Sequence, residues 1–199
     1  RAASQSPAAF EVGAGVSLTQ VLELVDGALP ALEKMLRVFG SRQIRSRATM
    51  GGNLVTCSPI GDLGPVLVAL QAIAVVKGRN GTRDVPMGDF LAGYRQTALR
   101  PGEILWAVRI PRPQGFAASY KVSKRREMDI STASAGMQVW VDNGIVRDIC
   151  LAYGGLAARP AQRAVATEAA LRGKPWTEAT VEAAVPHLDT DYQPISDLR

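Results

Sequence analysis

The sequence TMGGNLVTCSPIGDL, residues 49–63, combines two adjacent glycines with five short polar side chains and contains no lysine or arginine. The polar residues are Thr49, Asn53, Thr56, Ser58 and Asp62. Gly51 and Gly52 can adopt positive φ, and a turn of exposed backbone N–H groups holds a phosphate without a formal positive charge. The polar side chains can bond a polyhydroxylated chain. The alternative interpretation is a glycine-rich loop that caps a helix beginning near Ser58-Pro59.

The residues before this segment extend the pattern. A helix is expected to begin with Pro30 at its first position and to end near Phe39-Gly40. Its apolar stripe consists of Leu32, Met35, Leu36 and Phe39. Gln43-Ile44-Arg45 then precede the paired glycines.

These motifs together closely resemble the flavin-binding part of the molybdenum hydroxylases, and most closely their xanthine dehydrogenase branch. Three further segments match in the same order, namely residues 58–63, residues 94–97 (YRQT) and residues 125–130 (RREMDI). The resemblance covers nearly the whole chain. It implies that electrons from hypoxanthine or xanthine, oxidised at a molybdenum centre, pass through [2Fe–2S] clusters to FAD and then, as hydride, to NAD⁺.

The resemblance also implies roles for single residues. The FAD pyrophosphate would be held by Thr49, Asn53 and the amides of Gly51 and Gly52. The ribityl chain would be bonded by Thr56, Ser58 and Asp62. Phe39 would lie on one face of the isoalloxazine and Leu105 on the other side, with Lys121 near its polar edge. The nicotinamide side would be bordered by Tyr94, Arg125, Met128 and Asp129.

The chain departs from the family pattern at two places. Gly61 stands where close relatives often carry serine, and Met128-Asp129 stands where they can carry two acids. The family's glycine-rich loop on a preceding subdomain has no counterpart in this sequence, and both ends look cut. An iron–sulfur domain and a molybdopterin-binding subunit are therefore expected on other segments or chains of a hetero-oligomer.

Basic residues give the chain a formal net charge of +5 and form two clusters. The first is Arg37, Arg42, Arg45 and Arg47; the second is Lys121, Lys124, Arg125 and Arg126. They can be solvated surfaces, can attract an anionic cofactor or nucleotide, or can serve a non-catalytic RNA-interaction module. No aromatic residues interleave with them to stack bases, so no nucleic acid is expected.

Cysteine and histidine usage argues against a metal site in this chain. Cys57 and Cys150 lack CxxC spacing and are expected to be buried, and the single histidine, His187, has no companion at ligand spacing. No apolar run approaches the length of a membrane span, and residues 1–7 have no signal-peptide pattern. A flexible N-terminus and a cytoplasmic location are expected.

The hydrophobic pattern predicts an α+β fold with domains at residues 1–112 and 113–199, divided by the proline-rich residues 111–115. The first domain is expected to contain a strand at 10–12 and a helix capped by Ser17. A buried helix at 63–70, interrupted by Gly64-Pro65, and strands at 72–77, 82–85 and 104–110 complete it.

The second domain is expected to be a three-stranded antiparallel sheet followed by helices. Its strands are predicted at 117–122, 132–141 and 145–153, with a charged loop at 123–130. Its helices are predicted at 160–171 and 176–185, and residues 189–199 show no packed ending. By pattern alone, Leu105 is a core residue, Lys121 and Arg125 belong to a solvated loop and its flank, and Asp62 is a helix cap.

The sequence therefore predicts the FAD-binding segment of a xanthine dehydrogenase-type molybdenum hydroxylase. A flavoprotein subunit for aldehyde or carbon monoxide oxidation, or one using another acceptor such as oxygen, remains the alternative.

Overall fold

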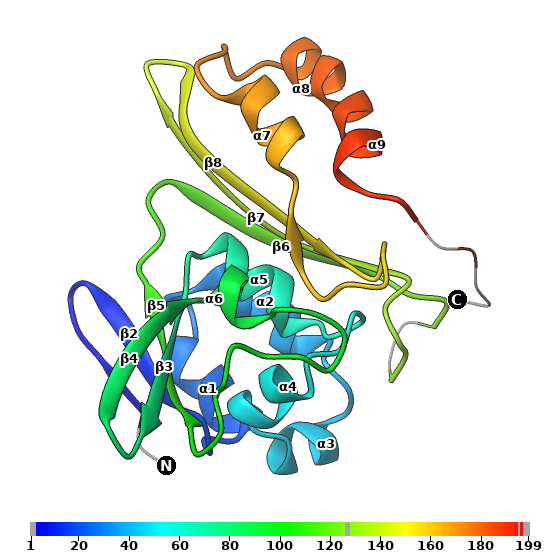
Figure 1. The fold of residues 1–199 in the computed structure, drawn as a ribbon. Coiled ribbons are helices and arrows are strands. Elements are labelled where there is room, and N and C mark those ends of the chain that lie inside the picture. Colours follow the sequence, from blue (N-terminus) through cyan, green and yellow to red (C-terminus); the bar gives the residue numbers. More distant parts are fainter. Residues whose placement is uncertain (1–2, 126–127, 195, 197–199) are drawn as a thin grey trace.

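The computed structural model describes residues 3–125, 128–194 and 196. Arg126 and Glu127 of the predicted charged loop lie outside these residues. Figure 1 shows two lobes, a lower one built from the first half of the chain and an upper one built from the second half. Among the described residues, no helix combines the length and apolar character needed to cross a bilayer.

The N-terminal lobe contains a five-stranded antiparallel sheet in the order β1-β2-β5-β3-β4. Its strands are β1 (Ala3–Gln5), β2 (Ala9–Gly13), β3 (Ile73–Gly78), β4 (Gly81–Pro86) and β5 (Ile104–Pro111). Its helices are α1 (Leu18–Val25), α2 (Pro30–Arg37), α3 (Arg42–Arg47), α4 (Met50–Thr56), α5 (Leu63–Ala69) and α6 (Met87–Phe90). The expected flexible N-terminus is wrong for Ala3–Gln5, which pairs with β2.

The boundaries of α1 and α2 follow from their end residues. The Ser17 hydroxyl accepts from the Gln20 backbone N–H, and the Gln20 side chain accepts from the Ser17 backbone N–H. The predicted capping box is therefore confirmed. Pro30 opens α2 as expected. However, α2 ends at Arg37, so Phe39 lies beyond the helix, next to Gly40 at φ +51°.

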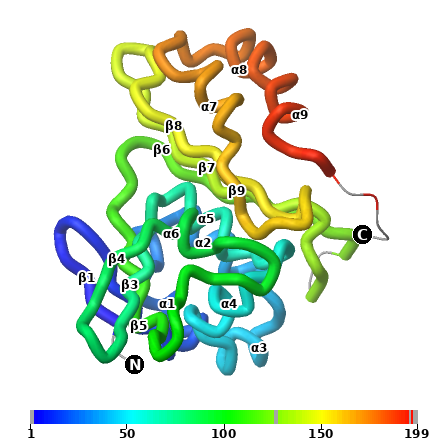
Figure 2. The backbone as a smooth tube through the Cα atoms, in the orientation of Figure 1, coloured from blue at the N-terminus to red at the C-terminus, as the bar shows by residue number. Residues whose placement is uncertain are grey.

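Helix α5 is continuous, and the predicted interruption at Gly64-Pro65 is wrong. Pro65 occupies the third helical position, where the backbone N–H would have no partner within the helix. All seven residues of α5 are buried, because the helix lies between the two lobes and packs against the second sheet. Figure 2 shows the long strands of the upper lobe running above α2 and α5.

The C-terminal lobe contains a four-stranded antiparallel sheet, β6-β7-β8-β9. Its strands are β6 (Phe116–Val122), β7 (Ala133–Asp142), β8 (Ile145–Gly154) and β9 (Gln162–Arg163). Three strands were predicted; the missed β9 occupies the expected start of the following helix, so α7 spans only Val165–Leu171. Asn143 and Gly144 both have positive φ and make the tight turn between β7 and β8.

The chain is packed as far as Tyr192, contrary to the prediction that residues 189–199 show no packed ending. Helix α8 (Glu178–Ala184), a 3-10 turn (Val185–His187) and α9 (Leu188–Asp191) lead to Tyr192, which is 5% exposed. Its hydroxyl donates to the Gln162 carbonyl at 2.6 Å, and its ring meets Tyr153 edge-on. No local sequence pattern indicates this contact, because the residues that Tyr192 contacts lie on β8 and β9.

Close backbone contact joins the two lobes. A Cβ on Gly136 of β7 would lie 2.4 Å from the Pro65 carbonyl oxygen, so only glycine lets α5 approach this strand. On the neighbouring strand, the buried Ser119 hydroxyl donates to the Ala31 carbonyl at 2.7 Å. The lobes are therefore fixed to each other through α2 and α5. The division at residues 112 and 113 stays a prediction.

Candidate cofactor-binding site

The paired glycines form the first turn of α4, and the expectation of positive φ at Gly51 and Gly52 is wrong. Thr49 is the N-cap, and its hydroxyl accepts from the Gly52 backbone N–H at 3.0 Å. The interpretation as a glycine-rich segment with a helix cap therefore describes the local backbone. The cap residue is Thr49 and not Ser58.

Gly51 is glycine because α4 packs tightly against the turn after β2. A Cβ on Gly51 would lie 2.6 Å from the Ala14 Cβ, and its N–H donates to the Ala14 carbonyl at 2.8 Å. The Met50 N–H similarly donates to Val16 at 3.1 Å. Both glycine amides are thus engaged by protein acceptors, and the open nest of amides expected from the sequence is not formed.

The polar side chains of α4 share one face of the helix. Positions i, i+3, i+4 and i+7 of this face are Thr49, Gly52, Asn53 and Thr56, which are exposed or half-buried. Met50 and Leu54 are buried on the opposite side. Within the described part of the chain, the Asn53 side chain makes no hydrogen bond. The Thr56 hydroxyl donates to the Gly52 carbonyl at 2.7 Å and keeps its acceptor lone pairs.

Ser58 and Gly61 lie at the end of this polar face. Both line a small pocket with Asn53. In the part of the chain that the structure describes, the Ser58 hydroxyl makes one long contact, accepting from the Ile60 N–H at 3.4 Å. Cys57 is buried as expected: its thiol donates to the Gln96 carbonyl at 2.9 Å, and burial raises its pKa.

Asp62 and Lys121 are 59 residues apart in sequence and form a buried ion pair. The Lys121 ammonium lies 2.7 Å from Asp62 Oδ2, and both side chains are 8% exposed. The pattern-based expectation of a solvated Lys121 is wrong, because this face of β6 points at the N-terminal lobe. Asp62 occupies the cap position of α5, but its side chain makes no capping bond.

Phe39 and Leu105 both contact the core of the N-terminal lobe. Phe39 is half-buried against that core, and Arg45 donates to its carbonyl at 2.9 Å. Leu105 is 7% exposed on β5 and is a core residue, as the pattern alone indicated. Their predicted position on opposite sides of an isoalloxazine stays a prediction.

The residues predicted for the acceptor side are mostly exposed. Tyr94 is 61% exposed, with the Arg95 guanidinium 5.6 Å from its ring centre. Arg125 lies in the charged loop, where Asp129 accepts from its backbone N–H at 2.8 Å and from its guanidinium at 3.4 Å. The first of these bonds is the main reason why the pKa of Asp129 lies below its usual value. Met128 is exposed, with φ +53°.

Ser131 is the residue that sequence reasoning missed. It is 1% exposed, and its hydroxyl donates to Asp62 Oδ1, the oxygen that Lys121 does not contact. Its partner lies 69 positions earlier, and no local spacing reveals such a contact. A single serine after a charged loop gave no signal.

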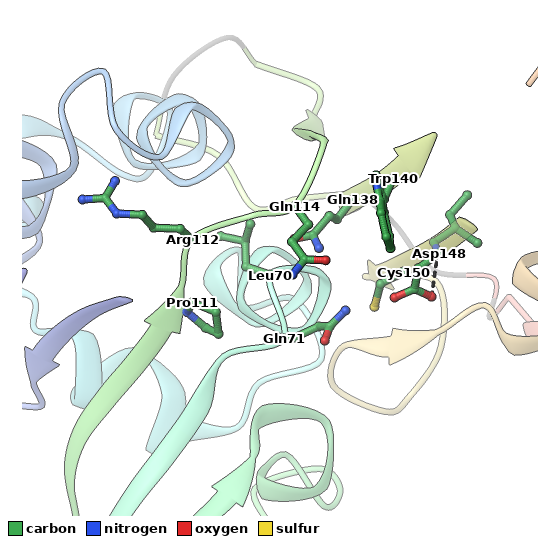
Figure 3. Close-up of a pocket in the computed structure, with 10 residues that line it drawn as sticks. Leu70, Gln71, Pro111, Arg112, Gln114, Gln138, Trp140, Asp148 and Cys150 are labelled. Carbon is green, nitrogen blue, oxygen red and sulfur yellow. Dashed lines mark hydrogen bonds between the residues drawn. The ribbon is translucent and has the colours of Figure 1, made fainter. Parts of the chain in front are cut away.

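A separate cavity lies at the junction of the two lobes, and no predicted site residue lines it. Figure 3 shows Gln71, Gln114, Gln138 and Trp140 around this cavity, which has a volume of about 140 Å³. The Gln138 Oε1 atom is buried there without a hydrogen-bond partner within the described residues. Among these residues no three His, Cys, Asp or Glu side chains gather closely enough to hold a metal ion.

Family comparisons agree with this arrangement. Residues 1–113 match a family model described as the FAD binding domain in molybdopterin dehydrogenase. Residues 118–199 match the CO dehydrogenase flavoprotein C-terminal domain.

Two curated proteins called xanthine dehydrogenase are similar to the chain. One, from Emericella nidulans, is 36% identical over 92% of this chain; the other, from Oryza sativa subsp. japonica, is 38% identical over 81%. The chain spans only 14% and 12% of their lengths.

Among solved structures, carbon monoxide dehydrogenase from Hydrogenophaga pseudoflava aligns with a TM-score of 0.92 at 29% identity. The alignment covers 100% of this chain and 70% of that one. Quinoline 2-oxidoreductase from Pseudomonas putida 86 aligns at 0.88 and 26% identity, covering 99% and 69% of the two chains.

Proposed function

The chain belongs to the family of FAD binding domains in molybdopterin dehydrogenases, and from this premise we propose that it is the flavin segment of a xanthine dehydrogenase-type enzyme. The proposed enzyme oxidises hypoxanthine or xanthine and reduces NAD⁺. The observation that carries the FAD assignment is the polar face of α4, which continues to Ser58 and Gly61.

The residues of this face fit the chemistry of FAD. Hydroxyl and amide side chains suit a phosphate-bearing, polyhydroxylated chain, and exposed Gly52 presents no Cβ to a ligand. We propose that Thr49, Gly52 and Asn53 contact the pyrophosphate and that Thr56, Ser58 and Asp62 bond the ribityl chain. Contact through the Gly51 amide would require it to leave the Ala14 carbonyl.

FAD supplies two-electron redox chemistry when bound, and the protein provides binding, orientation and electrostatics. Within the described residues Lys121 uses one N–H donor, to Asp62, so two others can face the polar edge of the ring. Phe39 and Leu105 supply apolar surface for its faces. Iron–sulfur and molybdopterin groups are proposed to lie on other segments or subunits.

Flavin content tests the proposal. The full-length protein should contain one FAD for each copy of this chain, measured after denaturation and chromatography. Asn53→Ala should reduce this occupancy, because it removes an unpaired amide from the polar face. Val55→Ala, on the exposed surface of the same helix, is the matched control. Equal occupancy in both variants would contradict the assignment of the α4 face.

The acceptor side is tested by separating the two half-reactions. If Arg125 and Asp129 border the NAD⁺ site, Arg125→Ala should slow NAD⁺ reduction while xanthine oxidation with an artificial dye continues. Arg147→Ala, which breaks an exposed Arg–Asp pair between β8 and β7, is the control. Equal loss with both acceptors would indicate damage to flavin binding or folding instead.

A different reducing substrate or acceptor is the second candidate. The alignments with carbon monoxide dehydrogenase and quinoline 2-oxidoreductase favour it, because the same flavin segment fits enzymes with those names. Turnover with an aldehyde, carbon monoxide or a quinoline but not with xanthine would select this alternative. FAD occupancy would be unchanged.

A further inference from the structure

The Asp62 carboxylate meets the two ends of a loop that lies about 60 to 70 residues later in the sequence. Oδ2 accepts from the Lys121 ammonium at 2.7 Å, and Oδ1 accepts from the Ser131 hydroxyl. Asp62 is 6% exposed and Ser131 is 1% exposed. The carboxylate is therefore held from both sides inside the interface between the two lobes.

A buried carboxylate needs both of these partners. An ionised group taken out of water is stable only when its lone pairs are hydrogen-bonded and its charge is compensated. Lys121 compensates the charge but contacts only one oxygen. Ser131 fixes the other oxygen, so it determines the rotation of the carboxylate and thereby the place of the Lys121 ammonium.

Ser131 and Lys121 also bracket the charged loop. Lys121 lies at the end of β6, Ser131 follows the loop, and the Thr132 N–H donates to the Val122 carbonyl at 2.8 Å across its base. The Arg125–Asp129 pair lies within the segment that these contacts enclose. One carboxylate from the N-terminal lobe thus anchors both ends of a loop on the C-terminal lobe.

We propose that Ser131 is a positioning residue for the flavin: through Asp62 it holds the Lys121 ammonium and the base of the charged loop where bound FAD meets them. This inference rests on the proposed FAD function. Loss of the Ser131 hydroxyl leaves one oxygen of a buried carboxylate without a donor. Near the flavin, a less compensated negative charge disfavours the reduced, more negative ring.

Ser131→Ala tests this role, with Ser134→Ala as its matched control. Ser134 is 2% exposed on the adjacent strand, and its hydroxyl has no partner within the described residues. FAD affinity is measured by fluorescence on full-length protein after the flavin has been removed and added back. Ser131→Ala should weaken binding about tenfold, as expected for a lost hydrogen bond to a charged group. Ser134→Ala should leave it unchanged.

Two further measurements separate positioning from general stability. Ser131→Thr, which keeps the hydroxyl, should restore the affinity, and the midpoint potential of bound flavin should fall in Ser131→Ala but not in Ser134→Ala. If Ser131→Ala does not fold, Ser131→Cys takes its place, because a thiol is a weak donor of similar size.

The two possible failures are distinguishable. If the unmodified protein takes up no FAD, the proposed function is wrong. If it takes up FAD while Ser131→Ala and Ser134→Ala bind it equally tightly and at the same potential, Ser131 has no positioning role.

Discussion

The two lobes are held together by different kinds of interaction. The N-terminal lobe has a large apolar core that includes Phe10, Leu32, Leu67 and Phe90, all completely buried. The C-terminal lobe has a much smaller apolar cluster and relies on buried polar groups. In it, Glu168 is 1% exposed and accepts from the Leu151 N–H at 2.8 Å and from Arg163 at 3.1 Å.

The two halves of the candidate site are therefore held rigid in different ways. The α4 face rests on the large apolar core, which fixes the helix without using its polar side chains. The C-terminal lobe contributes Lys121 from its sheet and Ser131 from the loop before β7. Its helices are held in place by hydrogen bonds to carboxylates. Substitutions in the two lobes should therefore change the free energy of unfolding by different amounts and with different pH dependence.

The largest effect is expected at Glu168. Glu168→Ala leaves the Leu151 N–H and the Arg163 guanidinium without their shared acceptor, and should lower the free energy of unfolding by about 2–4 kcal/mol. Arg163 is 45% exposed, so water compensates part of the loss. Chemical denaturation measures this value, with exposed Glu178→Ala as a control expected within about 0.5 kcal/mol of the unmodified protein. Similar values for the two variants would contradict the conclusion that the C-terminal lobe relies on buried polar groups.

Gly51→Ala tests the tight packing of the N-terminal lobe. The new Cβ would lie 2.6 Å from the Ala14 Cβ, and this overpacking should cost about 1–3 kcal/mol of unfolding free energy. Gly88→Ala is the control, because nothing lies within 4 Å of the added atom. It should be neutral or stabilising by up to about 1 kcal/mol. A Gly51→Ala variant as stable as Gly88→Ala would contradict the packing explanation.

Asp191 should make the C-terminal lobe sensitive to acid. Burial opposes its ionisation, but bonds from Ala166 and Thr167 outweigh this and hold the pKa of Asp191 below 3.8. Its contribution is therefore complete above pH 3.8 and is lost as the pH falls through the lower, folded-state value. Asp191→Asn should cost about 1–2 kcal/mol near neutral pH and flatten the stability profile in this acid range. Exposed Asp189→Asn should retain the profile of the unmodified protein.

The smallest effect is expected at Phe39, where the comparison extends to function. Phe39→Ala should weaken FAD binding by about 0.5–1.5 kcal/mol beyond lost burial, if the ring contacts the isoalloxazine. Val38→Ala, 40% exposed beside it, should not. FAD titration of both variants decides the point. Unchanged affinity in Phe39→Ala would leave Phe39 as a core residue only.

The sequence alone predicted the α+β class, the capping box at Ser17 and most of the strands. Those features depend on neighbours within a few positions, where alternation, proline, glycine and capping residues act directly. It also located the polar residues of α4 and identified their family. It did not reveal that the paired glycines are helical, because only the Ala14 backbone makes that close packing necessary.

Contacts between distant segments could be found only in the folded structure. Asp62 pairs with Lys121 and Ser131, and Tyr192 bonds Gln162, across separations that no periodic pattern records. Strand β9 could not be predicted either, because it is too short to show alternation. It forms by pairing with the edge of β8. A buried charge is stable only where the folded chain brings its partners together, and that arrangement is a property of the fold and not of the local sequence.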